Sequence, residues 1–168
     1  MIITKNESTL RHNLFLFLIP DTWSELTKIK SPRSGCGTCA VNNKIYLVGG
    51  WESSSSFLNM VESYSPLTDR WESCPSMISM RFKPGVSVLN NKIYVCGGET
   101  LFNYYHDSIE SYDVELRQWS FVTIMSSGRS WLSSTTLRLQ NPLVDDPEEA
   151  TGKPAFPKVF HLEKIEND

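Results

Sequence analysis

The chain has 168 residues, of which 40% are hydrophobic, and a formal net charge of −3 at pH 7. This length suits one domain with its own core, and mild acidity without a dense basic stripe argues against a nucleic-acid partner. The apolar run 14–19 ends at Pro20, so it is far shorter than the roughly 20 residues of a membrane-spanning helix. No small-residue cleavage site follows it. We therefore expect a soluble, cytoplasmic protein with no membrane partner.

One pattern recurs along the chain at an interval of 48 residues. Tryptophans, arginines and glycine pairs all keep this interval: Trp23, Trp71 and Trp119; Arg33, Arg81 and Arg129; Gly49-Gly50 and Gly97-Gly98. Residues 32–79 align with residues 80–127 without a gap. A repeat of this length corresponds to one structural unit, so the pattern predicts a repeat protein.

Each full unit predicts four short strands. In the first unit these are 36–41, 44–48, 60–64 and a strand opened by Trp71; in the second they are 85–89, 92–96, 108–112 and a strand opened by Trp119. Paired asparagines follow each first strand, and asparagine tolerates the positive φ of a tight hairpin turn. The second strand is nearly continuously apolar, as in strands buried on both faces. A period near 48 residues with four strands predicts a propeller blade.

The pattern is incomplete at both ends. A partial unit, 13–31, ends with the strand of Trp23, and residues 1–12 match nothing. A third unit, 128–140, begins with a strand-like stretch at 133–139, but the following prolines and paired acids are unsuited to a central strand. We expect 141–168 to be an irregular tail of low order. An open set of blades exposes apolar faces and strand edges.

The order of these features carries a family resemblance. Arginine, a small-residue strand, Ile-Tyr-x-x-Gly-Gly, Glu-Ser-Tyr, tryptophan and methionine together resemble the kelch repeat, twice over in residues 32–127. The fold class expected is all-β: a partial kelch-type β-propeller with two full four-stranded blades, partial blades at each end and an irregular C-terminal tail. Kelch propellers resemble six-blade rings, so the chain resembles about half of one, as a fragment or truncated isoform would.

Nothing in the sequence predicts catalysis, a cofactor or a metal site. Cys36 and Cys39 form a single Cys-x-x-Cys pair, whereas structural zinc needs four ligands. Residues three apart on a strand also point to opposite faces. Cys74 and Cys96 replace valines of the other repeat copy, which favours buried, reduced thiols. His12, His106 and His161 are scattered and build no triad.

The loops that differ between the units are the candidate partner-binding sites. Loops on rigid scaffolds vary without unfolding the core, and aromatic residues are enriched at binding hot spots. In kelch propellers the loop before each first strand opens on the same face as these variable loops. The residues of that loop therefore add basic and aromatic side chains to the candidate site. The predicted contact residues are Trp51, Phe57, Arg81, Lys83, Phe102, Tyr104, Tyr105, His106, Arg129 and Trp131. The repeated arginines also fit a structural role, which we favour for Arg33 and Arg129.

These features predict a non-catalytic protein-interaction module. The resemblance is greatest to the kelch region of adaptors that carry a BTB domain and recruit substrates to cullin ubiquitin ligases, which implies a ligase substrate as partner. Cullin would bind only through a BTB domain that this sequence does not contain. Two alternatives remain: an actin-binding cytoskeletal kelch protein, and a copper-oxidase propeller, which would need a cluster of tyrosine, cysteine and histidine.

Overall fold

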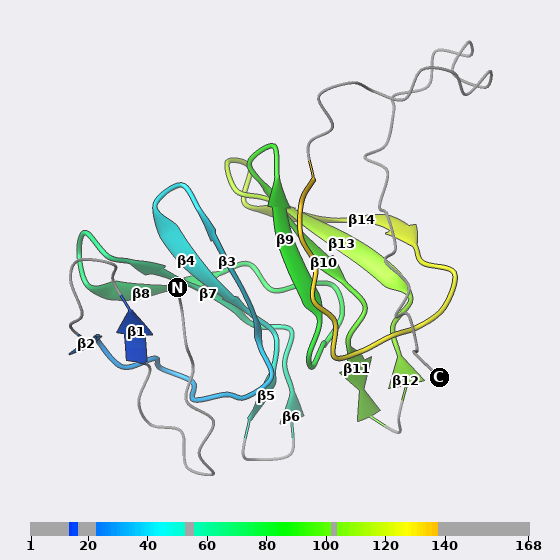
Figure 1. The fold of residues 1–168 in the computed structure, drawn as a ribbon, viewed down its shortest axis with the longest axis horizontal. Coiled ribbons are helices and arrows are strands. Elements are labelled where there is room, and N and C mark those ends of the chain that lie inside the picture. Colours follow the sequence, from blue (N-terminus) through cyan, green and yellow to red (C-terminus); the bar gives the residue numbers. More distant parts are fainter. Residues whose placement is uncertain (1–13, 17–22, 53–55, 102–103, 138–168) are drawn as a thin grey trace, which may run out of the picture. The chain divides into compact units, whose positions relative to one another are not determined.

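The computed structural model describes residues 14–16, 23–52, 56–101 and 104–137 (Figure 1). The chain divides into a unit of residues 1–136 and a second unit of residues 137–168, which lies outside the described residues except for Leu137. The regular elements of the described part are β-strands. In that part, no helix has the length and apolar character needed to span a bilayer. The predicted segments 1–12 and 141–168 lie outside the described residues.

Two antiparallel four-stranded sheets form the first unit's framework, and they confirm the two predicted full blades. The first blade has the strand order β3-β4-β7-β8 and the second β9-β10-β13-β14. The strands of the first blade are β3 (Gly37–Val41), β4 (Lys44–Val48), β7 (Val61–Ser65) and β8 (Arg70–Cys74). Those of the second are β9 (Gly85–Leu89), β10 (Lys92–Cys96), β13 (Ser108–Asp113) and β14 (Gln118–Ile124).

Paired asparagines make the first turn of each blade. Asn42 and Asn43 have φ of 51° and 55°, and Asn90 and Asn91 have φ of 48° and 62°. Two successive residues in the left-handed region form the hairpin turn whose twist matches that of the flanking strands. The turn fixes the register of the inner hairpin, in which Val41 pairs with Lys44.

Each blade also carries a short hairpin where the sequence predicted only a loop. These hairpins are β5 (Trp51–Glu52) with β6 (Ser56–Phe57), and β11 (Glu99–Thr100) with β12 (Tyr104–Tyr105). Figure 1 shows both hairpins at the same end of the blades, opposite the asparagine turns. The hairpins therefore place the two variable loops on one face of the repeat array.

The partial units differ in how much regular structure they contain. Strands β1 (Leu14–Leu16) and β2 (Trp23–Glu25) pair with Leu16 opposite Trp23, which is the register of Tyr64 opposite Trp71. They are therefore equivalent to the third and fourth strands of a blade. The strand predicted at 133–139 is absent from 133–137, and 138–139 lie outside the described residues. No second strand pairs with this stretch among the described residues, so its ladder hydrogen bonds are not made.

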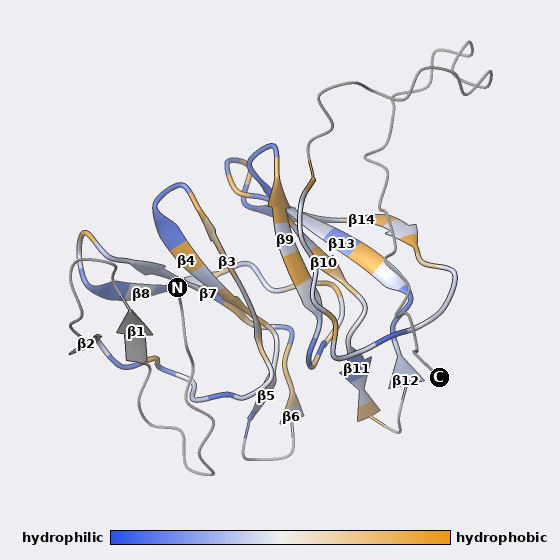
Figure 2. Cartoon of the chain, in the orientation of Figure 1, coloured by the Kyte–Doolittle hydropathy of each residue, from blue (hydrophilic) through white to orange (hydrophobic). Residues whose placement is uncertain are grey.

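The main hydrophobic core lies between the two blades. Buried Tyr46, Val48 and Val61 of the first blade pack against buried residues of the second, Ile93, Val95 and Tyr112. Figure 2 shows hydrophobic residues concentrated on β4, β9 and β10. The Trp119 indole packs against this core, and its Nε1 donates to the Pro75 carbonyl at 2.8 Å. The tryptophan thus packs between neighbouring blades, as its repetition predicted.

Candidate partner-binding face

The repeated arginines of the two full units form buried ion pairs. Arg33 Nη2 contacts Glu62 Oε2 at 2.5 Å, and Arg81 Nη2 contacts Glu110 Oε1 at 2.9 Å. Each arginine also donates to the carbonyl of the first glycine of its blade's diglycine, Gly49 or Gly97. The pair thus ties the entry of a blade to its second and third strands, using the planar, many-donor geometry of the guanidinium.

Arg81 must therefore be removed from the predicted contact residues. Its side chain is 0% exposed and donates to Glu110 and to the carbonyls of Gly97 and Ser108. Its donors are used inside the protein, because a buried charge is stable only when paired and hydrogen-bonded. Arg129 is half-buried, and within the described residues its side chain donates to the Ser127 hydroxyl at 3.2 Å and pairs with no carboxylate.

A cation and three aromatic rings gather where the second blade begins. The Lys83 ammonium lies over the Trp131 ring, and it is 5.1 Å from the centre of the Phe82 ring. Phe82 in turn meets Phe57 of the β5–β6 hairpin edge to face, with 5.9 Å between ring centres. Burial lowers the pKa of Lys83, while the charge of Glu99 raises it. Trp131 is 71% exposed, so this cation–π cluster has a large open aromatic surface.

A second group of polar aromatic side chains lies on the β11–β12 hairpin. Tyr104 and Tyr105 are exposed, and the Tyr104 ring stands edge-on to the His106 ring at 5.1 Å. His106 Nε2 lies 3.0 Å from the Met80 carbonyl. Burial lowers the pKa of His106, and the positive charge of Arg81 lowers it further. A neutral imidazole that donates Nε2–H to the Met80 carbonyl fits this environment.

The structure adds three residues that the sequence analysis missed. Phe82 joins Phe57 to Lys83, and Ile78 and Met80, in the same segment between β8 and β9, are 62% and 50% exposed. The sequence contained a signal for Ile78, because the equivalent positions of the other repeat copies carry the polar residues Lys30 and Ser126. Phe102 lies outside the described residues. We call the following set the contact face: Trp51, Phe57, Ile78, Met80, Phe82, Lys83, Tyr104, Tyr105, His106 and Trp131.

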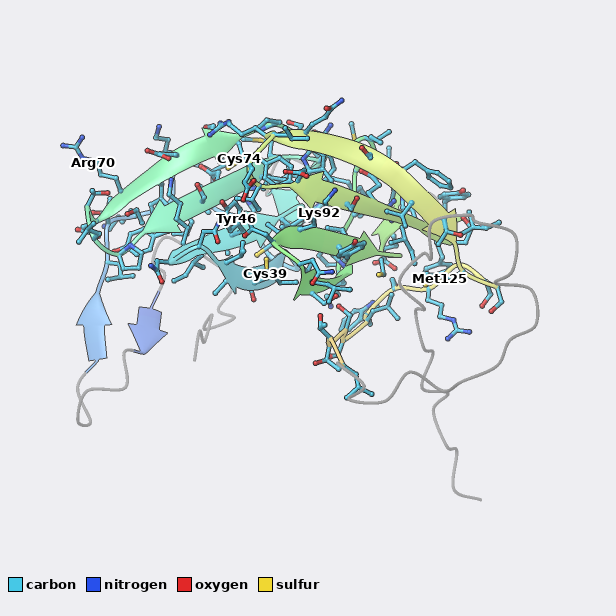
Figure 3. The ribbon with its side chains drawn as sticks, turned by 90° about the horizontal axis from the view of Figure 1, so that it is seen from above. Cys39, Tyr46, Arg70, Cys74, Lys92 and Met125 are labelled. Atoms are coloured by element: carbon cyan, nitrogen blue, oxygen red, sulfur yellow. The ribbon has the colours of Figure 1, made fainter. Side chains whose placement is uncertain are left out.

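The four cysteines are free thiols within the packing of the blades. Cys36 packs against the cluster of Leu47 and Trp71, whereas Cys39 packs against the core between the blades. Figure 3 shows Cys39, Tyr46 and Cys74 across one blade. Burial raises the pKa of Cys39 to about 12, which keeps this thiol protonated. Among the described residues, no three histidine, cysteine or acidic side chains gather as metal ligands.

The two blades, with the same internal contacts repeated in each, define a repeat protein of the propeller-blade class. Both units match the Kelch motif, at residues 32–78 and 80–126. The chain belongs to the kelch-repeat family, and its repeats indicate a protein-interaction module. No curated protein matches the chain.

Proposed function

We propose that this chain is a cytoplasmic, non-catalytic module that holds a protein partner on the contact face, as the substrate-recognition part of a kelch-type ubiquitin-ligase adaptor. The observation that carries the proposal is the exposed aromatic set around Lys83. Tyr105 and Trp131 are 46% and 71% exposed, and tyrosine and tryptophan are the side chains that dominate binding energy at protein interfaces.

The framework beneath this face supports a binding role. The hairpins that carry Tyr104 and Phe57 stand on blades fixed by the buried pairs of Arg81 and Arg33. A rigid base limits the ordering entropy that is lost on binding. The contact face therefore combines variable loops with a constant scaffold, which is how binding loops gain specificity.

The non-catalytic part of the proposal is supported by the side chains on this face. His106, the titratable imidazole among the described residues, is held by the Met80 carbonyl and the Tyr104 ring. Lys83 is held between two aromatic rings. Among the described residues, neither group has beside it the paired base or nucleophile that acid–base or covalent catalysis requires.

The test compares proteins bound in cells by the wild-type chain, by Tyr105→Ala/Trp131→Ala and by the control Leu67→Ala. Leu67 is 95% exposed in the turn between β7 and β8, away from both hairpins. We expect a partner that the double variant loses at least tenfold, that the control retains, and that accumulates when cullin ligases are inhibited. A partner retained by the double variant would refute the contact face. Cosedimentation with actin filaments, with no cullin effect, would replace the ligase role.

A further inference from the structure

The contacts between successive units recur at the repeat interval. The Lys83 amide donates to the Gly35 carbonyl at 2.7 Å, and the Trp131 amide donates to the Lys83 carbonyl at 3.0 Å. All three residues have positive φ, between 50° and 60°. Residues 129–131 therefore dock on the second blade as residues 81–83 dock on the first. The same backbone contacts therefore join each unit to the next, even where the later strands of a unit are not formed in the described residues.

At the far side of the second blade, the described residues that follow β14 cover mainly the inner strand β9. Gly85 of β9 lies against Leu132 and Ser134, and the Thr136 hydroxyl donates to the Val88 carbonyl at 2.6 Å. Towards the outer strands the cover is thinner. Tyr94 is half-buried, although its equivalent in the first blade, Tyr46, is only 4% exposed. This side therefore has the first strand position of a further blade, without the outer strands among the described residues.

At the opposite side of the first blade, the described residues that precede β3 cover β4 and the outer strands β7 and β8. Tyr64 and Trp71 are buried, and Trp71 Nε1 donates to the Thr27 carbonyl just after β2. On the inner strand β3, Thr38 and Ala40 are exposed. Their equivalents in the second blade, Val86 and Val88, pack against the core between the blades. This side therefore has the third and fourth strand positions of a preceding blade, and the part of the chain that the structure describes does not supply the inner ones.

We propose that a second copy of this chain completes both sides by sharing a blade. Residues 129–137 of one copy supply the inner strand position, and β1 and β2 of the other copy supply the third and fourth. The described residues thus provide three of the four strand positions. The shared blade covers Ala40 of one copy and the half-open Tyr94 of the other.

Two copies joined in this way close into a ring. Each copy brings two full blades, and each of the two junctions brings one shared blade, which makes about six blades, inside the range of known propellers. Closure removes the exposed edges that would otherwise invite uncontrolled pairing. The pairing rests on the strands at the two sides of the blades, independently of any partner on the contact face.

The test is the mass of the 168-residue chain by sedimentation equilibrium, at concentrations from about one to tens of micromolar, which detects a dimer whose dissociation constant is about micromolar or lower. A closed pair has twice the chain mass of 19.1 kDa. Ala40→Glu adds a charge at a site exposed in a single copy, so folding stays intact by circular dichroism. In the pair that charge is buried without a partner, and we expect the dimer dissociation constant to rise about tenfold or more.

Leu67→Glu is the matched control, because Leu67 lies in an outer turn and is 95% exposed. It adds the same charge and leaves the pair unchanged. Three results overturn the proposal: a monomer throughout the concentration range, a dimer that Ala40→Glu does not weaken, or an open series of larger species or aggregates. A monomer would point to further blades from another chain or a longer one as the natural cover.

Discussion

Replacing Arg81 by alanine tests the internal role assigned to the repeated arginines. In the wild type, Arg81 Nη2 lies 2.9 Å from Glu110 Oε1, and the arginine side chain is 0% exposed. The same carboxylate also accepts the amides of Ile78 and Ser79. Arg81→Ala leaves Glu110 buried with these two donors but without its counter-charge. Removing one partner of a buried ion pair costs about 3–5 kcal/mol.

That loss is large beside the stability of about 5–15 kcal/mol typical of a domain. Urea unfolding, followed by tryptophan fluorescence at one fixed protein concentration, measures it. Arg129→Ala is the control, because Arg129 occupies the same repeat position and, in the described part of the chain, its side chain donates to the Ser127 hydroxyl. We expect the control to cost about 1 kcal/mol or less. If Arg81→Ala costs no more than the control, the buried pair does not stabilise the blades and the reasoning is refuted.

Three further perturbations follow from the geometry. Gly49→Ala introduces a Cβ at φ +64° facing the Arg81 carbonyl, so we expect urea unfolding to show a loss of about 1–3 kcal/mol; an unchanged midpoint would contradict the packing described. Trp119→Phe removes an interblade hydrogen bond of 2.8 Å and should cost about 1 kcal/mol in the same assay, whereas no loss would show the bond to be dispensable. The Tyr64 hydroxyl donates to Asp69 and is the main cause that lowers the pKa of this carboxyl, and hydrogen bonds from Thr27 lower it further. This contribution to stability is therefore present above the unfolded pKa of Asp69 and fades as the pH falls through its folded pKa. NMR titration should show the Asp69 pKa rising in Tyr64→Phe, and an unmoved pKa would exclude the hydroxyl as its cause.

The strands of the full blades were predictable because two copies of one unit constrain each other. The predicted strands 44–48 and 92–96 coincide with β4 and β10, since the asparagine turns and glycine pairs bound them on both sides. The stretch 133–139 has the same local pattern as an inner strand. The strand predicted there is absent from 133–137 because a strand requires a hydrogen-bonding neighbour, which the local sequence does not reveal.

The candidate site was predictable only in part. Exposed Tyr104 and Trp131 were found because their loops break the repeat. The sequence of the loop does not decide the role of Arg81, because an arginine there is equally suited to pair with a buried carboxylate or with a carboxylate of a partner. A stronger signal was present: Arg33 precedes Glu62 by the same interval as Arg81 precedes Glu110, whereas the equivalent residue for Arg129 is Lys158. Co-repetition of opposite charges predicts the internal pair.

The most direct test of the binding role places a photoreactive phenylalanine analogue at the position of Tyr105, and in a second protein at that of Leu67. Both positions are exposed, so labelling reports which surface a partner covers. After irradiation in cells, we expect one defined partner protein crosslinked from the Tyr105 position and absent from the Leu67 position. Crosslinks to that partner from the Leu67 position alone would contradict the assignment of the contact face.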